Sequence, residues 1–580
     1  MPPQKRKSSS SSAANGASSH ASKRGKPDLS RPHPNSKETE EFGIVLRDFY
    51  PPEMSNERCE AYKNGTLERP IETLEKAYED TVEERQAIGP NAAVVHWFKS
   101  DLRLHDNRGL QMAYQAAHDH NVPLICLYIQ SPEDITAHLC SPARVDMTLR
   151  TLGQLQRDLS ELDIPLYMET QEKRKAIPQR IVDLCQEWGA NNLFANIEYE
   201  VDELRREAAL VRLCAQNGIK FEAAHDTCVV TPGKLSTQQG KQYAVYSPWY
   251  RSWRAFLKEN PEYLEMADEP GSNPSDARKH FKELFDCEVP AAPENKQLSE
   301  AEKKRLRKMY PEGEHEALRR LDVFLEEKAK QYDDMRNIMA KENTSVLSPY
   351  FASGALSART AVVHALAADK GKNQAGHQSW ISEVAWRDFY KHVLVNWPFI
   401  CMNKCFKPEF TNLEWEYDEE LFDAWSQGKT GYPIVDAAMR QLNEAAWMHN
   451  RTRMVVSSFL AKDLLIDWRR GERYFMEHLI DGDFASNHGG WGFGSSTGVD
   501  PQPYFRIFNP QRQSERFDPD GEYIRRWVPE LRDVQGAAIH DPYSHEAGKI
   551  AEKNGYPRPI VVHAESRDRA LERYKKASGH

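Results

Sequence analysis

The stretch AAVVHWFKSDLR, residues 92–103, decides the fold class. Its apolar half predicts a buried strand over 92–98, after which short apolar strands alternate with amphipathic helices. The elements we predict next are helix 106–120, strand 123–129, helix 143–162, strand 166–169, helix 177–188, strand 192–197, helix 201–217 and strand 220–230. This order is typical of a doubly wound, parallel α/β sheet with right-handed crossovers. Because Lys99–Arg103 follows the first strand without a GxGxxG motif, a nicotinamide dehydrogenase is disfavoured.

The chain changes character after this α/β region. From 315 to 527 the pattern is helical throughout, with amphipathic stretches expected at 315–340, 357–369, 378–396, 433–446, 451–468 and 471–479. The segment between the two regions is rich in proline, glycine and charge, which predicts a linker. The expected parts are a disordered basic tail (1–40), an N-terminal extension (41–91), the α/β domain (92–230), an interdomain linker (231–314), an all-α domain (315–527) and a short polar C-terminal tail (528–580).

Charge limits how this chain can hold a partner. It has 580 residues and a formal net charge of -10; six basic and no acidic residues fall within the first 27, so the remainder carries -16. This balance argues against binding nucleic acid or an anionic membrane by bulk charge.

No apolar run approaches the roughly 18 residues of a membrane span. Nine cysteines without a CxxC pair fit a reducing compartment.

The N-terminal tail carries two basic clusters, 5–7 and 23–26. Such clusters suggest nuclear import, but an acid-free, serine-rich start also suits a mitochondrial presequence. A solvated tail without an address is the third interpretation.

Aromatic residues mark the first candidate site. Nine of the 13 tryptophans lie between residues 380 and 527. The helix predicted around 380–395 has one apolar face that suffices for docking, and its other face carries Trp380, Glu383, Trp386, Arg387 and Tyr390. Flat aromatics beside a carboxylate and a guanidinium form a pocket wall for a planar ring with hydrogen-bonding edges. The alternative is a second core contact with a structural Glu–Arg pair.

The segment 481–494 is the second candidate. Residues 482–498 contain six of the chain's 30 glycines, and glycine lets the backbone approach a ligand closely. Asp481, Asp483 and Asn487 add acceptors and an amide to what we interpret as a ligand-binding loop. An ordinary surface loop is the alternative.

Two further segments are weaker candidates. Asn343–Ser348 offers hydroxyls and successive N–H groups before a helix, which can hold phosphate or simply cap the helix. Trp447–Met454 combines two arginines with an asparagine, which suits a nucleobase or phosphodiester, or a buried salt bridge. The sequence has no HExxH motif, no complete GxxxxGK[ST] phosphate loop and no Cys/His cluster, and a GxSxG match at 494–498 lies within the glycine-rich segment. We therefore predict no metal site and no hydrolysis by a metal or a serine triad.

Four segments together resemble the photolyase/cryptochrome family: 94–107, 380–390, 428–440 and 481–491. Within it the chain is similar to class I cyclobutane pyrimidine dimer photolyases, and most to fungal members, over about residues 92–565. The resemblance implies an α/β antenna domain and a helical domain that binds a folded FAD. The residues implied around FAD are Tyr332, Thr344, Ser345, Val346, Leu347 and Ser348 at the ribityl chain and phosphates, Trp380 and Asn450 near the cofactor, Arg453 with Asp481 and Gly482 against the isoalloxazine ring, Asp483 at its polar edge and Asn487 beside flavin N5.

The resemblance also implies a lesion pocket. Glu383 matches the carboxylate that hydrogen-bonds the dimer, and Trp386 matches the ring that stacks on it. The other residues implied at DNA are Asn450, Arg451 and Met454 in the pocket walls, Phe493 where bacterial relatives carry a second Trp, and Arg336, Arg387 and Arg506 at phosphates. An electron-transfer chain from flavin to surface is implied for Trp491, Trp468 and Trp415. An antenna, 5,10-methenyltetrahydrofolate, is implied by His138, Glu203 and Cys401, whereas Asp202 stands where a bacterial relative has Asn.

The implied activity is light-dependent DNA repair by a carbon–carbon lyase. Excited, fully reduced FAD (FADH⁻) gives an electron to the flipped-out dimer, the cyclobutane ring opens and the electron returns. We expect a monomer that binds UV-damaged DNA and no membrane, in the nucleus, the mitochondrion or both. One alternative is a cryptochrome-type photoreceptor, disfavoured by Asn487 and the short C-terminal tail. The other is a (6-4) photolyase, disfavoured because Asn450 and Met454 stand where histidines suited to proton transfer would be expected.

Overall fold

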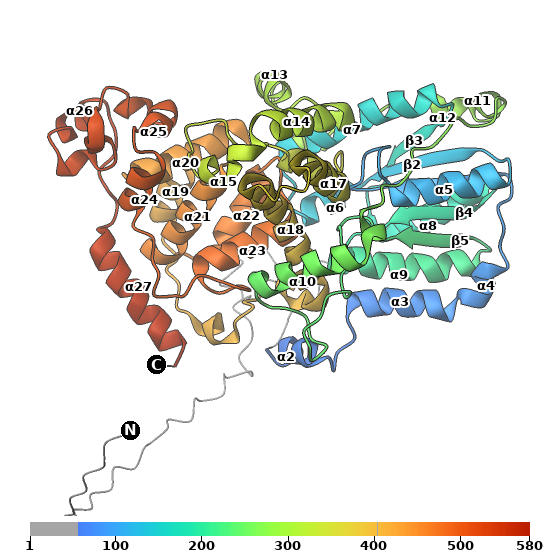
Figure 1. The fold of residues 1–580 in the computed structure, drawn as a ribbon, viewed down its shortest axis with the longest axis horizontal. Helices are drawn as coiled ribbons and strands as arrows, with labels where there is room; N and C mark the ends of the chain where they lie inside the picture. The colour runs from blue at the N-terminus through green and yellow to red at the C-terminus, as the bar shows by residue number, and fades with distance from the viewer. Residues whose placement is uncertain (1–55, 403, 580) are drawn as a thin grey trace, which may run out of the picture.

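The computed structural model describes residues 56–402 and 404–579, so the predicted basic tail (1–40) lies outside the described residues. A five-stranded parallel sheet forms the α/β half, in the order β3-β2-β1-β4-β5. Its strands are β1 (Ala93–Phe98), β2 (Leu124–Gln130), β3 (Leu166–Thr170), β4 (Ala190–Asn196) and β5 (Lys220–Ala224). A sheet half beside a helical half (Figure 1) confirms the predicted fold class. The last strand is shorter than predicted, because the chain leaves the sheet after Ala224.

Helices cover both faces of the sheet, as a doubly wound fold requires. One face packs against α5 (Arg108–Asp119) and α7 (Pro142–Glu161), and the other against α8 (Ile177–Glu187) and α9 (Val201–Gln216). The register is parallel, with Val94 opposite Leu124 and Phe98 opposite Tyr128. A short helix, α6 (Pro132–Ala137), follows β2. The carboxyl ends of the strands lie toward the helical half, and the loops that follow them can carry ligand-binding residues.

The N-terminal extension is helical where it is described. It contains α2 (Asn56–Asn64), α3 (Pro70–Asp80) and α4 (Val82–Gln86). Helix α3 lies alongside α9 (Figure 1) and buries Leu74 and Ala77 in the core on that side of the sheet. The extension therefore packs on the body, which the sequence could not decide.

The segment 231–314, expected to be a linker, contributes to the core. It includes α10 (Tyr246–Glu259), η2 (Pro261–Leu264), α11 (Ala277–His280), α12 (Lys282–Phe285), η3 (Glu294–Lys296) and α13 (Glu300–Met309). Helix α10 crosses between the two halves (Figure 1) and buries Trp249 and Trp253 against the helical half. These two tryptophans lie four residues apart, so they share one face of the helix and dock it.

The helical half begins at Gly313. Its elements are α14 (Gly313–Glu327), η4 (Ala329–Gln331), α15 (Tyr332–Met335), α16 (Ser348–Ser353), α17 (Ala358–Asp369), α18 (Ala375–Asn396), η5 (Pro398–Met402), η6 (Pro408–Asn412), α19 (Glu419–Ser426), α20 (Pro433–Ala445), α21 (Asn450–Ser458), the π-helix η7 (Phe459–Asp463), α22 (Trp468–His478), α23 (Phe484–Ser495), α24 (Pro510–Phe517) and α25 (Glu522–Trp527). The single helix predicted over 451–468 is thus divided, since a π-helical turn follows α21 and α22 begins at Trp468.

The glycine-rich segment 481–494 corrects a prediction. We interpreted it as a loop, but most of it is helix α23. Its glycines allow close packing rather than a loop conformation: a Cβ added at Gly489 would lie 2.2 Å from the ring of Tyr390, and one at Gly494 would lie 2.2 Å from Ser457 Oγ. Helices α18 and α21 can therefore approach α23 more closely than any larger residue would permit.

The C-terminal segment 528–580 is also more structured than the polar tail we expected. It contains η8 (Pro529–Leu531), η9 (Gly536–Ile539), η10 (Pro542–Ser544), α26 (Gly548–Lys553) and α27 (His563–Ala577). Helix α27 packs against η6 and η7 and buries Tyr574, whose hydroxyl donates to Ser495 O over 2.6 Å. The end of the chain therefore supports the helical half.

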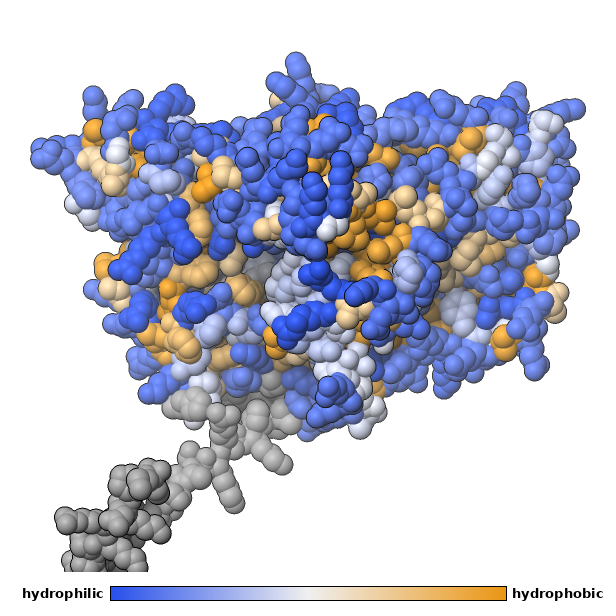
Figure 2. Space-filling model, in the orientation of Figure 1, coloured by the Kyte–Doolittle hydropathy of each residue, from blue (hydrophilic) through white to orange (hydrophobic). Residues whose placement is uncertain are grey.

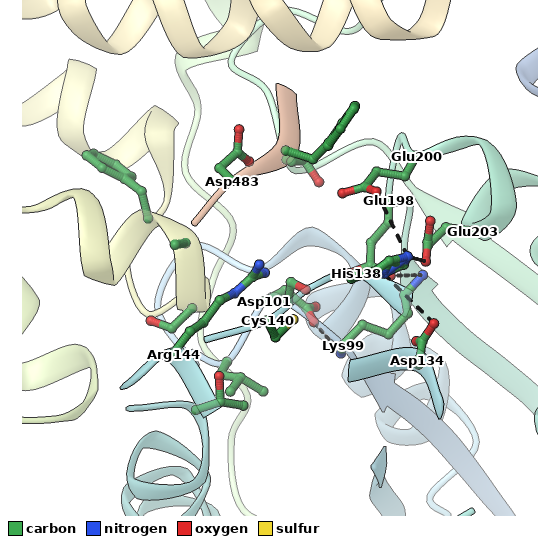
Figure 3. Close-up of a pocket in the computed structure, with 18 of the residues that line it drawn as sticks. Lys99, Asp101, Asp134, His138, Cys140, Arg144, Glu198, Glu200, Glu203 and Asp483 are labelled. Atoms are coloured by element: carbon green, nitrogen blue, oxygen red, sulfur yellow. Dashed lines mark hydrogen bonds and ion pairs between the residues drawn. The ribbon is translucent and has the colours of Figure 1, made fainter. Parts of the chain in front are cut away.

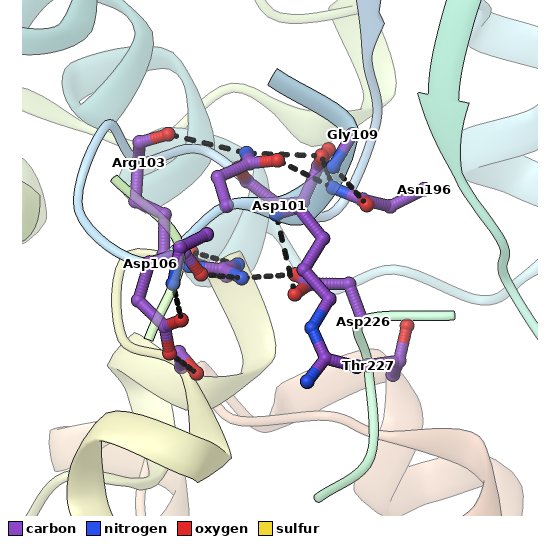
Figure 4. Close-up of polar contacts among 12 residues, drawn as sticks. Asp101, Arg103, Asp106, Gly109, Asn196, Asp226 and Thr227 are labelled. Atoms are coloured by element: carbon purple, nitrogen blue, oxygen red, sulfur yellow. Dashed lines mark hydrogen bonds and ion pairs between the residues drawn. The ribbon is translucent and has the colours of Figure 1, made fainter. Parts of the chain in front are cut away.

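A buried polar network joins the two halves (Figure 4). Arg359 of α17 donates to Asp106 Oδ1 through Nε (2.8 Å) and Nη2 (2.5 Å), and to Asp226 Oδ1 over 2.9 Å. Asp226 also pairs with Arg103, from the loop after β1. Gly354 makes the contact tight, because a Cβ there would lie 2.1 Å from Ser100 O and its φ is +75°. These contacts fix how the sheet meets the helices.

The surface is mostly hydrophilic on the face that Figure 2 shows, with apolar residues gathered near α17. Within the described ranges, no helix is both long and apolar enough to cross a membrane.

Candidate functional site

A cavity of about 500 Å³ lies within the helical half, between α18, α21, α22 and α23. Many of the residues implied for FAD or the lesion line it: Tyr332, Arg336, Thr344, Ser348, Glu383, Trp386, Arg387, Asn450, Arg451, Arg453, Met454, Asp481, Asp483, Asn487, Trp491 and Phe493. Ser345, Val346, Leu347, Trp380 and Gly482 are not among the lining residues. The cavity size falls in the usual range of cofactor pockets, about 300–1,000 Å³.

The carboxylate on α18 sits in a charged corner of this cavity. Arg336 donates to Glu383, and Arg451 lies on the same wall. Burial raises the pKa of Glu383, while Arg336 and Arg451 oppose that rise. The result is a carboxyl group that protonates more readily than an exposed glutamate and can share a proton with a ligand.

Trp386 is held by a residue that the sequence reasoning missed. Its ring stacks on Tyr246 of α10, with 3.5 Å between the ring centroids and 10° between the planes. The Tyr246 hydroxyl is fixed in turn by the Ser382 main-chain oxygen at 2.7 Å. Tyr246 lies 140 positions from Trp386 in the sequence, in the segment predicted as a linker, so no local pattern could have found it.

Two acidic residues close the opposite side of the cavity. Arg453 donates to Asp481 Oδ2 over 2.7 Å and to Met448 O over 2.8 Å. Asp483 caps α23 by accepting from Ser486 N (2.9 Å), and its other oxygen accepts from Lys391 Nζ (2.8 Å). Burial opposes ionisation of Asp483, but Lys391 and Arg387 outweigh it and hold its pKa well below the ordinary value. Asp483 is therefore a fixed anion.

Asn487 projects from the first turns of α23. Its Nδ2 donates to Glu472 O of α22 over 3.0 Å, which fixes the plane of the amide. An amide nitrogen carries two hydrogens, so one remains for a ligand in the cavity. Asn487 can therefore donate a hydrogen bond without adding negative charge.

The Thr344–Ser348 turn lies at the edge of the cavity through Thr344 and Ser348. Trp447 Nε1 donates to Ser348 Oγ over 3.1 Å, and Trp380 Nε1 donates to Ser345 Oγ over 3.3 Å. Trp380 is buried and therefore supports the turn from behind. Trp447 lines the cavity itself, and its place in the Trp447–Met454 segment was the signal that could have identified it.

The predicted DNA-contacting arginines divide into two groups. Arg336 and Arg451 face the cavity, where Arg451 Nη2 also donates to Asn337 Oδ1 over 2.7 Å. Arg387 lines this cavity and a second one, and donates to Thr227 O over 2.6 Å, so it lies in the wall between them. Arg506 lies outside the cavity on an exposed loop, next to Phe505, which is 63% exposed and was not predicted.

The three tryptophans implied for electron transfer differ in depth. Trp491 lines the cavity and is 2% exposed, Trp468 is buried, and Trp415 is half-buried. Of the three, only Trp491 lines the cavity and only Trp415 is partly exposed.

A second cavity of about 190 Å³ lies at the carboxyl ends of the strands, between the two halves (Figure 3). His138 and Glu203 line it, and His138 Nε2 lies 3.1 Å from Asp202 Oδ2 and 3.2 Å from Glu203 Oε1. Burial, together with Asp202 and Glu200, holds the pKa of Glu203 well above its ordinary value. Arg174 pairs with Asp202 over 2.5 Å.

The predicted antenna residues are only partly brought together. Cys401 is buried in η5, in the apolar core of the helical half, and is not among the residues that line the second cavity. The same cavity wall contains an arrangement that the sequence spacing did not suggest, since ligand atoms of Asp134, His138, Asp202 and Glu203 lie within 4.8 Å of one another. Arg174 pairs with the carboxylates of Asp134 and Asp202 and already balances part of their charge.

The residues of the main cavity fit a flavin dinucleotide. Asp481 Oδ1 is buried without a hydrogen-bond partner among the described residues, and so awaits a donor. Gly490 presents backbone to the cavity, and a Cβ added there would meet no atom within 4 Å. Planar aromatics, a fixed anion and hydroxyls along one edge match a large, flat, polar-edged cofactor. Fold and site together define a two-domain protein with an α/β domain and a helical cofactor-binding domain.

Comparisons with known proteins agree with this description. Residues 94–267 match the family model described as DNA photolyase, and residues 380–576 match the FAD binding domain of DNA photolyase. The deoxyribodipyrimidine photo-lyase of Neurospora crassa is 57% identical over 565 residues, which is 94% of this chain and 92% of the relative. The mitochondrial deoxyribodipyrimidine photo-lyase of Saccharomyces cerevisiae is 33% identical, covering 97% of this chain and 98% of the relative.

Solved structures give the same result. A bacterial class III photolyase from Agrobacterium tumefaciens superposes with a TM-score of 0.73 at 33% identity, covering 84% of this chain and 98% of that one. A cryptochrome from Synechocystis superposes with a TM-score of 0.70 at 26% identity, covering 83% and 98%. The chain belongs to the DNA photolyase family, and its helical half is an FAD-binding domain. The predicted family and the predicted likeness to fungal members are confirmed.

Proposed function

We propose that this chain is a light-dependent deoxyribodipyrimidine photo-lyase of class I, which splits cyclobutane pyrimidine dimers in UV-damaged DNA. One observation carries the proposal: Glu383 and Trp386 line the same cavity as Asp481, Asp483 and Asn487. A flipped-out pyrimidine dimer can therefore contact a carboxyl group and an aromatic ring while it lies beside a flavin.

The residues of the chain position the reactants. Trp386 offers a rigid stacking surface, because Tyr246 supports its ring. Glu383, with its raised pKa, donates a hydrogen bond to a base carbonyl when protonated and stabilises negative charge that develops there. Arg453 and Asp481 would hold the flavin ring, and the free N–H of Asn487 would donate a hydrogen bond to it. When bound, fully reduced FAD supplies the electron that light makes available for transfer.

Residues in and around the cavity would serve DNA binding and the reduction of oxidised flavin. Asn450, Arg451, Met454 and Phe493 enclose the dimer in our proposal, and Arg336, Arg387 and Arg506 neutralise phosphates. An overall acidic chain then binds intact DNA weakly, because only these local contacts release counterions. Trp491, Trp468 and Trp415 are the residues that would carry electrons from the surface toward a bound, oxidised flavin.

For the antenna we propose 5,10-methenyltetrahydrofolate in the second cavity. Six carboxylates and four cationic side chains line that cavity, so acidic groups are in excess. The methenyl bridge of this folate carries a positive charge, which an acidic wall attracts. His138 and Glu203 are the residues we assign to it, and Cys401, in the apolar core of the helical half, is left without a contact to it. Extraction of the cofactors from purified chain tests for folate directly.

We further propose that the chain acts as a monomer in the nucleus, the mitochondrion or both. The basic clusters of the N-terminal tail support nuclear import, and the word "mitochondrial" in the yeast relative's name supports the second compartment.

The decisive experiment is repair by purified protein under blue light. One oligonucleotide duplex carries a defined thymine cyclobutane dimer, and a second carries a (6-4) product. We expect the first to be restored only in the light and the second to persist. If the cyclobutane dimer persists while the flavin is reduced, the proposed function is wrong; photochemistry without repair of either lesion favours a photoreceptor.

A further inference from the structure

Lys462 is buried where a lysine costs free energy. It belongs to the π-helix η7 and is 1% exposed. Burial lowers the pKa of Lys462 to about 7, and the neighbouring Asp463 only partly offsets that effect. A methionine would fill the same space without burying a charge, and apolar replacement of buried charges is often neutral or stabilising. A role other than packing therefore accounts for the lysine.

Its ammonium reaches a main-chain oxygen of an exposed segment. Lys462 Nζ donates to Arg506 O over 3.0 Å. Arg506 belongs to the segment 501–507, which contains no helix or strand and carries the exposed ring of Phe505. An irregular segment is mobile unless other parts of the chain hold its backbone. The hydrogen bond from Lys462 therefore fixes the Arg506 carbonyl, which lies beside the exposed side chains of Phe505 and Arg506.

The groups around Lys462 leave it available for this contact. Asp463 is occupied by His563 Nδ1 at 2.5 Å, and its main-chain oxygen accepts from Arg569 over 2.8 Å. The face of Tyr574 lies 5.9 Å from Lys462 Nζ, and Tyr504 of the exposed segment stacks on the same ring, with 6.3 Å between centroids and 4° between planes. The C-terminal helix α27, through Tyr574, and the π-helix, through Lys462, thus both contact the segment 501–507. Sharp irregularities such as π-helical turns are frequent at functional sites.

We infer that Lys462 is a positioning residue for duplex DNA: it holds the segment 501–507 so that Phe505 and Arg506 meet the duplex beside the flipped lesion. This inference rests on the proposed function. It assigns to the π-helix, and to the C-terminal helix behind it, a part in recognising the duplex rather than the dimer.

The test compares two ligands for Lys462→Met. The first is a duplex with one thymine dimer, and the second is the isolated thymine dimer dinucleotide, which fills the cavity but has no duplex to meet the segment. We expect about tenfold weaker duplex binding, unchanged dinucleotide binding, and unchanged repair per absorbed photon at saturating DNA. The slope of log K for duplex binding against log salt concentration should become less negative by about 0.9, which corresponds to the loss of one phosphate contact.

Two further variants make the result interpretable. Lys462→Gln keeps a hydrogen-bond donor without the charge and should recover most of the duplex affinity. Lys404→Met removes another almost fully buried lysine, controls for the loss of a buried ammonium in general, and should leave duplex affinity unchanged. Unchanged duplex affinity in Lys462→Met, or equal loss for both ligands, would overturn the inference. If the wild-type chain itself does not prefer the lesion duplex, the proposed function fails instead.

Discussion

Glu383 and Trp386 lie one turn apart on α18, yet each depends on a different part of the chain. Glu383 pairs with Arg336, which follows α15, and Trp386 rests on Tyr246 of α10. A helix can place two functional side chains at the right spacing, but it cannot by itself fix their orientation or shield them from water. The chemistry of the site therefore belongs to contacts between elements that are distant in sequence.

Replacement of Trp386 by alanine tests the stacking surface. Stacking of a base on an aromatic ring contributes about 1–3 kcal/mol, so the variant should lose roughly 5- to 150-fold of its preference for dimer-containing over intact DNA. Fluorescence anisotropy with both duplexes measures that preference. Trp188→Ala, a partly buried tryptophan of the α/β half, is the control and should bind like wild type. An unaltered preference in Trp386→Ala would remove the residue from the lesion pocket.

Single residues could be predicted from the sequence where a local pattern carried them. Glu383 and Trp386 stood out because the opposite, apolar face of their helix suffices for docking, so an aromatic and charged second face called for another explanation. Asn487 stood out because it lies among glycines and aspartates. Tyr246, Asn337 and Lys462 could not be found this way. Each acts through a partner far away in sequence, and neither periodicity nor composition records such contacts.

At the scale of elements, the packing of α22 against α23 forms one wall of the cavity. Gly471 lies on α22 where a Cβ would come within 2.0 Å of the ring of Trp491. Trp491 is buried and lines the cavity, so its ring has little freedom to move. The two helices are therefore fitted to each other at a residue without a side chain.

Gly471→Ala should destabilise the fold although alanine is the better helix former. Overpacking costs typically about 1–3 kcal/mol, whereas the gain in helix propensity is only about 1 kcal/mol. Gly153→Ala in α7 is the matched control, since its nearest neighbours lie at 3.8 Å; that variant should be neutral or slightly more stable. Urea unfolding of both variants measures the difference. Equal stability of the two would show that Trp491 can move away at no cost.

Elements were predicted well where hydrophobic periodicity was strong, as in the alternating strands and helices of residues 92–217. The prediction was wrong for 481–494, because glycine was taken as a sign of loop conformation when its use here is close helix packing. The segments 231–314 and 528–580 hold more structure than expected. Apart from α10, α13 and α27 their helices span six residues or fewer, and the role of their few buried aromatics depends on the surface on which they dock.

At the scale of the whole molecule, the relation between the two halves depends on a buried ion network. Burial opposes ionisation of Asp106, but Arg359, Ser357 and Arg103 outweigh it and lower the pKa of Asp106. A carboxylate with a lowered pKa stabilises the folded state above the pKa of the unfolded chain, about 3.9, and this contribution is lost as the pH falls through the folded value. The joint between the α/β half and the helical half should therefore weaken in acid.

Arg359→Met tests this joint. Removing one partner from a buried ion network costs about 3–5 kcal/mol, because it leaves buried charge unpaired. We expect that loss near neutral pH, and a smaller further loss between about pH 5 and pH 3 than in wild type, since the main cation that lowers the pKa of Asp106 is gone. Urea unfolding across this pH range measures both effects.

Arg278→Met supplies the control for that experiment. Arg278 pairs with Asp163 over 2.6 Å at an exposed position, so its loss should change stability by less than about 1 kcal/mol at any pH. If Arg359→Met follows the acid branch of wild type, Asp106 does not owe its lowered pKa to Arg359. If both arginine variants cost the same, the network joins the halves no more firmly than a surface ion pair, and the apolar contacts of α7 and α10 must hold the α/β half in place.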